Sequence, residues 1–323
     1  MFRSFAIFIF VLASAPAIAE VRPIEQAFTQ LEAGEFEQAV ATVTPLAAAG
    51  DPDAQHLLGY LYENGLGVEK NLQRAVELYA AAGAAGQADA QFSLGELSLM
   101  GDGVTKNTAT AAGWYRLAAR QGHALAMLRL GVMHMQGDGV AQNKNEAMDF
   151  FERAAVLGEA EAMRNLAIAY LSGDGVEKNP RTAAEWFDKG AAAGDPVSAY
   201  NLGLMLQSGA LGEADLDAAA APMRMAAEAG FAPAMTGLGL LIHRGAEAAE
   251  APADWFERAA KVGDPQGRFL YAVALTEGDG REKDADSAVL LLNDLQSDAA
   301  APADLRQQAE QLKARILRDR RGG

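Results

Sequence analysis

Residues 94–122 read LGELSLMGDGVTKNTATAAGWYRLAARQG, and this pattern returns every 36 residues, as from Gly86 to Gly122. One glycine ladder keeps that spacing along most of the chain, at Gly50, Gly86, Gly122, Gly158, Gly194 and Gly230, with Gly263 following after 33 residues. A second ladder places a small residue after a leucine, at Gly59, Gly95, Gly131, Ala167, Gly203 and Gly239. Two ladders in phase indicate an internal repeat of about seven units.

Each unit carries two segments with the apolar periodicity of an amphipathic helix. In one unit the apolar positions are Ala54, Leu58, Leu61 and Tyr62, followed by Ala75, Leu78, Tyr79 and Ala82. Spacings of three and four residues place such side chains on one face of a helix of about three turns. A glycine inside a helix costs about 1 kcal/mol relative to alanine. Its recurrence after the leucine therefore predicts that two helices approach closely there.

A glycine-rich loop separates the two helices of a unit. It reads Gly101-Asp102-Gly103-Val104 in the segment above and returns with small changes at residues 65–68, 137–140 and 173–176. Glycine adopts the left-handed conformation that ends a helix. An asparagine three residues after each valine can cap the next helix; these are Asn71, Asn107, Asn143 and Asn179. The fifth and sixth loops should differ in shape, because Leu211 and Glu247 replace the second glycine.

The combination of Ala, Leu-Gly, Tyr, Gly-x-Gly-Val, Ala, an aromatic pair, Ala-Ala and Gly resembles the Sel-1-like repeat, a relative of the tetratricopeptide repeat. The aromatic pairs are Trp114-Tyr115, Phe150-Phe151, Trp186-Phe187 and Trp255-Phe256. The resemblance covers nearly all of residues 51–299 and implies an all-α fold, a right-handed α-solenoid of antiparallel helix pairs. Such arrays need polar-faced terminal elements. We expect a degenerate helix pair within residues 20–50 and a basic capping helix with a tail at residues 300–323.

The first residues predict export. Arg3 precedes an apolar run from Phe5 to Leu12 and small residues that end at Ala19, which is typical of a cleaved signal peptide over residues 1–19. The run is shorter than the roughly 20 residues of a membrane-spanning helix, so we expect no transmembrane segment after cleavage. Cysteine is absent, which excludes disulfides, thiolate metal sites and a lipoprotein anchor. We expect a periplasmic or secreted protein.

Charge and motif content argue against several functions. The formal net charge of -16 repels nucleic-acid phosphates and anionic lipids. The four histidines lie in different units, without the one-turn pair of a helical metal site. Each glycine loop offers a single aspartate, such as Asp102, which is too few for calcium. No Walker loop, Gly-x-Ser-x-Gly elbow or Ser-x-x-Lys motif occurs. We therefore expect no cofactor, no metal and no catalytic residue.

The resemblance also implies a face for a protein partner. In the tetratricopeptide fold the first helix of each unit lines a concave face, which selects the positions equivalent to His56, Tyr60 and Glu63. The candidate contact residues are His56, Tyr60, Phe92, Glu96, Leu99, Leu128, Val132, Met135, Arg164, Ile168, Leu171, Tyr200 and Leu204. These columns either form an apolar trough for a partner's helix or extended segment, or are buried between neighbouring first helices. Solvent accessibility of Phe92, Val132, Met135 and Ile168 distinguishes the two.

The function implied by the resemblance is a non-catalytic scaffold for protein–protein interactions in periplasmic signalling, envelope assembly or export. Two alternatives stay open. A secreted branch with such repeats suggests a hydrolase acting on cell-wall or β-lactam-like substrates, which would need polar side chains converging in one pocket. A self-associating structural protein would show a mass in solution that changes with concentration.

Overall fold

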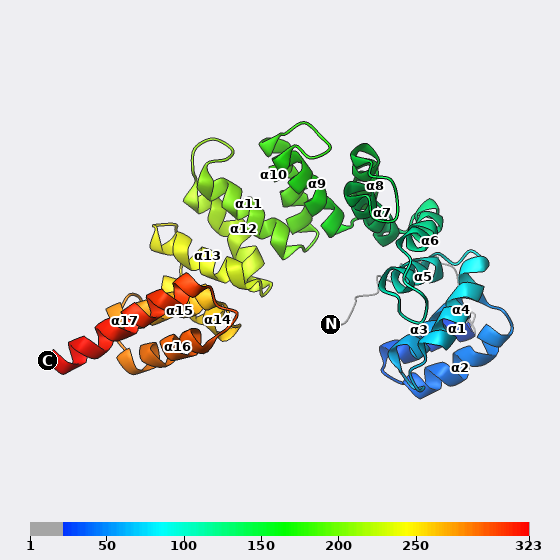
Figure 1. The fold of residues 1–323 in the computed structure, drawn as a ribbon, viewed down its shortest axis with the longest axis horizontal. Helices are drawn as coiled ribbons and strands as arrows, with labels where there is room; N and C mark the ends of the chain where they lie inside the picture. Colours follow the sequence, from blue (N-terminus) through cyan, green and yellow to red (C-terminus); the bar gives the residue numbers. More distant parts are fainter. Residues whose placement is uncertain (1–21, 323) are drawn as a thin grey trace, which may run out of the picture. The chain divides into compact units, whose positions relative to one another are not determined.

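The computed structural model describes residues 22–322, and this range contains helices and no strands (Figure 1). The signal peptide expected at residues 1–19 lies outside the described residues. The helices are α1 Pro23–Glu32, α2 Phe36–Ala48, α3 Pro52–Asn64, α4 Leu72–Ala84, α5 Ala88–Met100, α6 Thr108–Arg120, α7 Ala124–Gln136, α8 Lys144–Val156, α9 Ala160–Ser172, α10 Pro180–Ala192, α11 Pro196–Ser208, α12 Leu216–Glu228, α13 Ala232–His243, α14 Pro252–Lys261, α15 Pro265–Glu277, α16 Ala285–Ser297 and α17 Ala303–Gly322.

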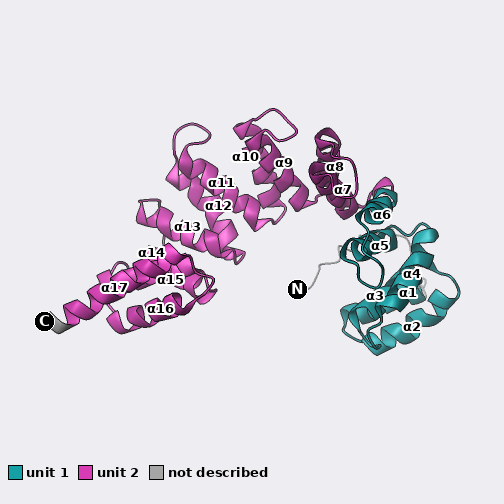
Figure 2. Cartoon of the chain, viewed as in Figure 1, with its two compact units in different colours: residues 1–118 teal, residues 119–323 magenta. Residues whose placement is uncertain are grey.

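The helices form two compact units, and the boundary along the chain falls between Ala118 and Ala119, inside α6 (Figure 2). Within each unit, most helix pairs in contact are neighbours along the chain. The core is a series of separate clusters, one of which joins Ala27, Val43 and Leu61 from α1, α2 and α3. Because the apolar faces are buried against adjacent helices, the predicted all-α repeat architecture is confirmed.

The loop chemistry explains where the helices begin and end. Gly101 ends α5 in the left-handed conformation, with φ of 87°. Asn71 begins α4, and its side-chain oxygen accepts a hydrogen bond from the Arg74 amide at 3.0 Å. Both predicted roles are confirmed. The sixth repeat differs as expected, because the C-cap residue that follows α13 is Arg244 in the right-handed helical conformation and not a left-handed glycine.

The second loop glycine has a role between repeats that the sequence did not reveal. A Cβ atom added at Gly67 would lie 2.5 Å from the carbonyl carbon of Phe36, at the start of α2. A Cβ atom at Gly103 would lie 3.0 Å from the carbonyl oxygen of Leu72, at the start of α4. The loop backbone therefore packs directly on the first turn of the preceding repeat's second helix, where a side chain has no room.

The small residue after the leucine lies against the second residue of the aromatic pair. A Cβ atom added at Gly131 would lie 2.5 Å from the ring of Phe151, and one at Gly59 would lie 2.7 Å from the ring of Tyr79. Both rings are buried. The predicted close approach of the two helices in a repeat is therefore confirmed. Because these glycines have no side chain, the aromatic ring can pack directly against the helix backbone.

The C-terminal helix α17 packs on the last repeat. Ala309, Leu312 and Ile316 on α17 are buried against α15 and α16. Basic residues on its polar face reach acidic residues of the last repeat, with Arg320 Nη1 2.7 Å from Asp286 Oδ1. No helix within residues 22–322 is both long enough and apolar enough to cross a lipid bilayer.

Candidate partner-binding cleft

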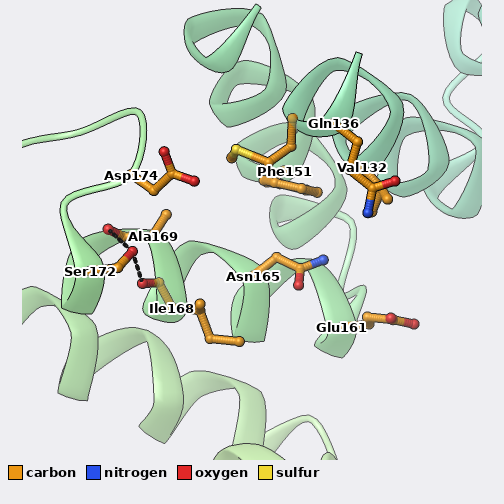
Figure 3. A pocket seen from close by; sticks show the side chains of 10 residues that line it. Val132, Gln136, Phe151, Glu161, Asn165, Ile168, Ala169, Ser172 and Asp174 are labelled. Atoms are coloured by element: carbon orange, nitrogen blue, oxygen red, sulfur yellow. Dashed lines mark hydrogen bonds between the residues drawn. The ribbon is translucent and has the colours of Figure 1, made fainter. Parts of the chain in front are cut away.

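A cleft of about 330 Å³ opens between α7 and α9 in the C-terminal unit. Figure 3 shows the α9 residues Asn165 and Ile168 and, above them in this view, Phe151, which comes from α8. Asp174 lies at one end of the cleft and Glu161 at the other (Figure 3). The lining residues are Val132, Met135, Gln136, Phe151, Glu161, Asn165, Ile168, Ala169, Ser172 and Asp174.

Helical spacing brings each wall together. Val132, Met135 and Gln136 are three and four residues apart, so they share one face of α7. Asn165, Ile168 and the other α9 residues of the cleft follow the same spacing. The two walls belong to successive repeats, which is why they are distant in sequence and adjacent in space.

The first two repeats fill the equivalent position with a polar contact. The Tyr79 hydroxyl donates a hydrogen bond to Glu63 at 2.7 Å, and the Tyr115 hydroxyl donates one to Glu96 at 2.6 Å. The third repeat has Phe151 in the tyrosine column.

Its positions equivalent to Glu63 and Glu96 are Met135 and Val132. The hydroxyl and both acceptors are thus replaced by apolar groups. The third repeat consequently offers an apolar floor where the first two make a hydrogen bond.

Some polar side chains of the cleft form hydrogen bonds or ion pairs within the protein, and others do not. Asp174 forms an ion pair with Lys144 at 2.5 Å, and Glu161 forms one with Arg164 at 3.2 Å. The Ser172 hydroxyl donates to the Ile168 carbonyl oxygen at 2.8 Å. Gln136 and Asn165, in contrast, make no side-chain hydrogen bond with any other residue in the described range. Two side-chain amides therefore line the cleft without a protein partner in the described range, the exposed Gln136 and the half-buried Asn165.

Of the residues predicted for the partner face, Val132, Met135 and Ile168 line this cleft. Ile168 is 48% exposed, as are several other large apolar side chains on the surface of the described residues, such as Val156 at 84%. Val132 and Met135 are half-buried and Ile168 is exposed, so none of the three is enclosed between neighbouring helices. Their contact with a partner stays a prediction.

The structure corrects the prediction for four other residues. His56, Phe92, Glu96 and Leu128 are all buried, with Leu128 at 0% exposure. His56 and Phe92 pack on Tyr79 and Tyr115, the rings of their own repeats. A partner cannot reach these side chains while the repeats remain stacked, so they belong to the core.

Arg164 and Tyr200 show where the same column points in later repeats. Arg164 Nη1 lies 2.6 Å from Asp195 Oδ1, and the Tyr200 ring lies 5.2 Å from the Phe231 ring. Asp195 and Phe231 are the N-cap residues of the next repeats' first helices. The column is therefore directed at the neighbouring repeat, and Arg164 is a connection between repeats.

The remaining candidates are partly buried in packing or lie in the N-terminal unit. Leu171 packs against the cluster around Phe187, and Leu204 packs against the cluster around Met223. Tyr60 and Leu99 are half-buried residues of the N-terminal unit and are not among the residues that line the α7–α9 cleft. Sequence reasoning missed Gln136 and Asn165. Their helical spacing from Val132 and Ile168 was the signal that could have identified them.

Glu159, the N-cap residue of α9, makes no side-chain cap hydrogen bond. Burial raises the pKa of its carboxyl group because the charged form is poorly solvated there. A raised folded-state pKa stabilises the fold at low pH, and this contribution is lost as the pH rises through that pKa. We expect Glu159→Gln to raise the melting temperature at pH 7.5. The gain should vanish below about pH 4, where unfolded glutamate is protonated. An equal gain at both pH values would contradict this explanation.

Within residues 22–322, no group of three or more histidine, aspartate or glutamate side chains is placed to hold a metal ion.

Comparison with known proteins places these features in a family. The Sel1 repeat model matches seven consecutive segments, at residues 52–87, 88–123, 124–159, 160–195, 196–231, 232–264 and 265–293. A crystal structure of a Sel1 repeat protein from Oxalobacter formigenes is 29% identical, with a TM-score of 0.67 over 74% of this chain and 99% of that one. A protective antigen of uropathogenic Escherichia coli strains, which displays an SLR fold, is 25% identical, with a TM-score of 0.59 over 85% of this chain and 68% of that one. No curated protein matches the sequence.

Proposed function

Because this chain belongs to the Sel1 repeat family, we propose that it is a non-catalytic scaffold that holds a protein partner in the cleft between α7 and α9. Sel1 repeat proteins generally mediate protein–protein interactions. The observation that carries the proposal is that the exposed apolar side chain of Ile168 and the amide of Asn165, which has no protein partner in the described range, line the same cleft. An exposed apolar surface with polar groups at its rim is characteristic of an interaction site.

The setting of this interaction is the periplasm or the exterior of the cell, in signalling, envelope assembly or export. The support for this part is the sequence of residues 1–19, with Arg3, an apolar run and a small-residue cleavage site. Crosslinking in the intact cell envelope, followed by mass spectrometry, tests the location and the partner together. Recovery of the chain without any crosslinked protein would contradict the scaffold.

Two substitutions test whether the partner uses the cleft. We expect Ile168→Asp and Met135→Asp each to weaken binding of the crosslinked partner about tenfold or more, roughly 1.4 kcal/mol, because a buried carboxylate would face an apolar surface. The measurement is titration of the purified partner, with circular dichroism to verify that helicity is unchanged.

Val156 provides the matched control. It is apolar and 84% exposed at the end of α8, and it does not line the cleft. Val156→Asp therefore introduces the same charge on the same unit and should leave binding unchanged. Equal binding by all three variants and the native protein would exclude the cleft as the binding site.

A further inference from the structure

Resting on the proposed function, the chemistry of the cleft identifies the form of its occupant. We infer that the cleft binds an extended peptide segment of the partner, with an apolar side chain on the floor and a lysine or arginine on each side. Three features of the described residues carry this inference: the size of the apolar floor, the amides on both walls and the charge at the two ends.

The floor accommodates a small apolar group. Val132, Met135 and Phe151 form it together with Ile168 and Ala169. Its volume of about 330 Å³ is at the lower end of the roughly 300–1,000 Å³ typical of ligand pockets. A site of this size suits one or two side chains better than the whole apolar face of a long helix.

The amides favour an extended backbone. Gln136 on α7 and Asn165 on α9 lie on opposite walls. Each side-chain amide offers two donor hydrogens and an acceptor oxygen. An extended segment presents free N–H and C=O groups that need such partners, whereas the backbone groups of a helix are already paired. Amides on both walls therefore match an extended chain that runs between α7 and α9.

The charge at the ends of the cleft selects cations. Asp174 and Glu161 lie at opposite ends (Figure 3), and no lysine, arginine or histidine is among the lining residues. Each carboxylate already has one cationic contact, but a carboxylate accepts several hydrogen bonds. The net charge of -16 also attracts basic segments over distance. Basic residues on both sides of the apolar anchor fit this arrangement.

Synthetic peptides with a fluorescent label test the inference. The probe is a ten-residue peptide with a central leucine between lysines. One comparison peptide has glutamates in place of the lysines, and another has the lysine sequence held helical by a chemical staple. Fluorescence anisotropy with the full chain measures the affinities. We expect tighter binding of the flexible lysine peptide than of either comparison, and weaker binding at high salt because the charges are screened.

Variants of the two amide residues test whether the peptide binds in the cleft. Asn165→Ala and Gln136→Ala should each lower the affinity for the lysine peptide about 3- to 10-fold, as expected for the loss of one or two hydrogen bonds. Asn201 is the matched control, since it occupies the asparagine position one repeat later, outside the cleft, and donates to the Val197 carbonyl oxygen. Asn201→Ala should leave the affinity unchanged.

Several outcomes would overturn the inference. Equal affinity for the lysine and glutamate peptides would show that the cleft does not select basic residues beside the apolar side chain. Tighter binding of the stapled peptide would indicate a helical occupant. A mass in solution that rises with concentration, and returns to monomer in Ile168→Asp, would assign the cleft to a second copy of the chain. The scaffold proposal fails when no protein is crosslinked to the chain in the intact envelope, and its placement in the cleft fails when the crosslinked partner is insensitive to Ile168→Asp.

Discussion

Gly67→Ala is expected to lower the free energy of unfolding by about 2–4 kcal/mol. Gly67 has φ of 68°, a conformation that costs roughly 1–2 kcal/mol for a residue with a side chain. The added Cβ would also lie 2.5 Å from the Phe36 carbonyl carbon and 2.7 Å from the Glu37 amide nitrogen. Backbone atoms cannot rotate away as a flexible side chain can, so the repeat interface must shift. Urea unfolding followed by circular dichroism measures the loss.

Gly50→Ala separates the cost of the left-handed backbone conformation from the cost of the steric clash. Gly50 has φ of 89°, but a Cβ there would meet nothing within 4 Å. It therefore carries the conformational cost of roughly 1–2 kcal/mol alone. A loss at Gly67 no greater than that at Gly50 would show that the loop does not press on the start of α2 as the structure has it.

Gly95→Ala is expected to lower the free energy of unfolding by about 1–3 kcal/mol, although alanine has the higher helix propensity. A Cβ at Gly95 would lie 2.6 Å from Cδ1 of Tyr115. The ring is fully buried and its hydroxyl donates to Glu96, so it has no alternative position nearby. The helix pair α5–α6 must separate to admit one methyl group. Thermal and urea unfolding report the effect.

Gly113→Ala is the control in the same helix pair. Gly113 lies within α6, and a Cβ there would meet nothing within 4 Å. The helix propensity of alanine should then raise stability by up to about 1 kcal/mol. Opposite signs at Gly95 and Gly113 are the expected result. A gain in stability at both positions would contradict the close packing of glycine on the tyrosine ring.

Ala167 shows that the need for glycine after the leucine differs from one repeat to another. It occupies the Gly95 position of the fourth repeat and is buried in the cluster that contains Phe187. The side chain of alanine is thus accepted where the helix pair is packed around it. Gly95→Ala tests a repeat whose packing was established without the methyl group, where the surrounding core relaxes only in part.

The repeat, its helices and their boundaries could be read from the sequence because short-range interactions control them. Gly101 ends a helix through its own backbone conformation, and Asn71 begins one by accepting a hydrogen bond from an amide three residues away. These effects depend on a few adjacent residues and recur whenever the residues recur. The apolar periodicity also identified the buried leucines, including Leu58 and Leu94.

Only the tertiary structure decided which first-helix residues are accessible. Leu128 and Ile168 belong to the same predicted face, yet Leu128 is buried and Ile168 is 48% exposed. Exposure depends on what the adjacent repeats place opposite each side chain, which lies about 36 residues away in sequence. In the second repeat the Tyr115 hydroxyl donates a hydrogen bond to Glu96. Phe151 occupies the same position in the third repeat and has no hydroxyl. The apolar cleft at the third repeat depends on contacts between residues of different repeats. The helical periodicity within one repeat carries no information about those contacts.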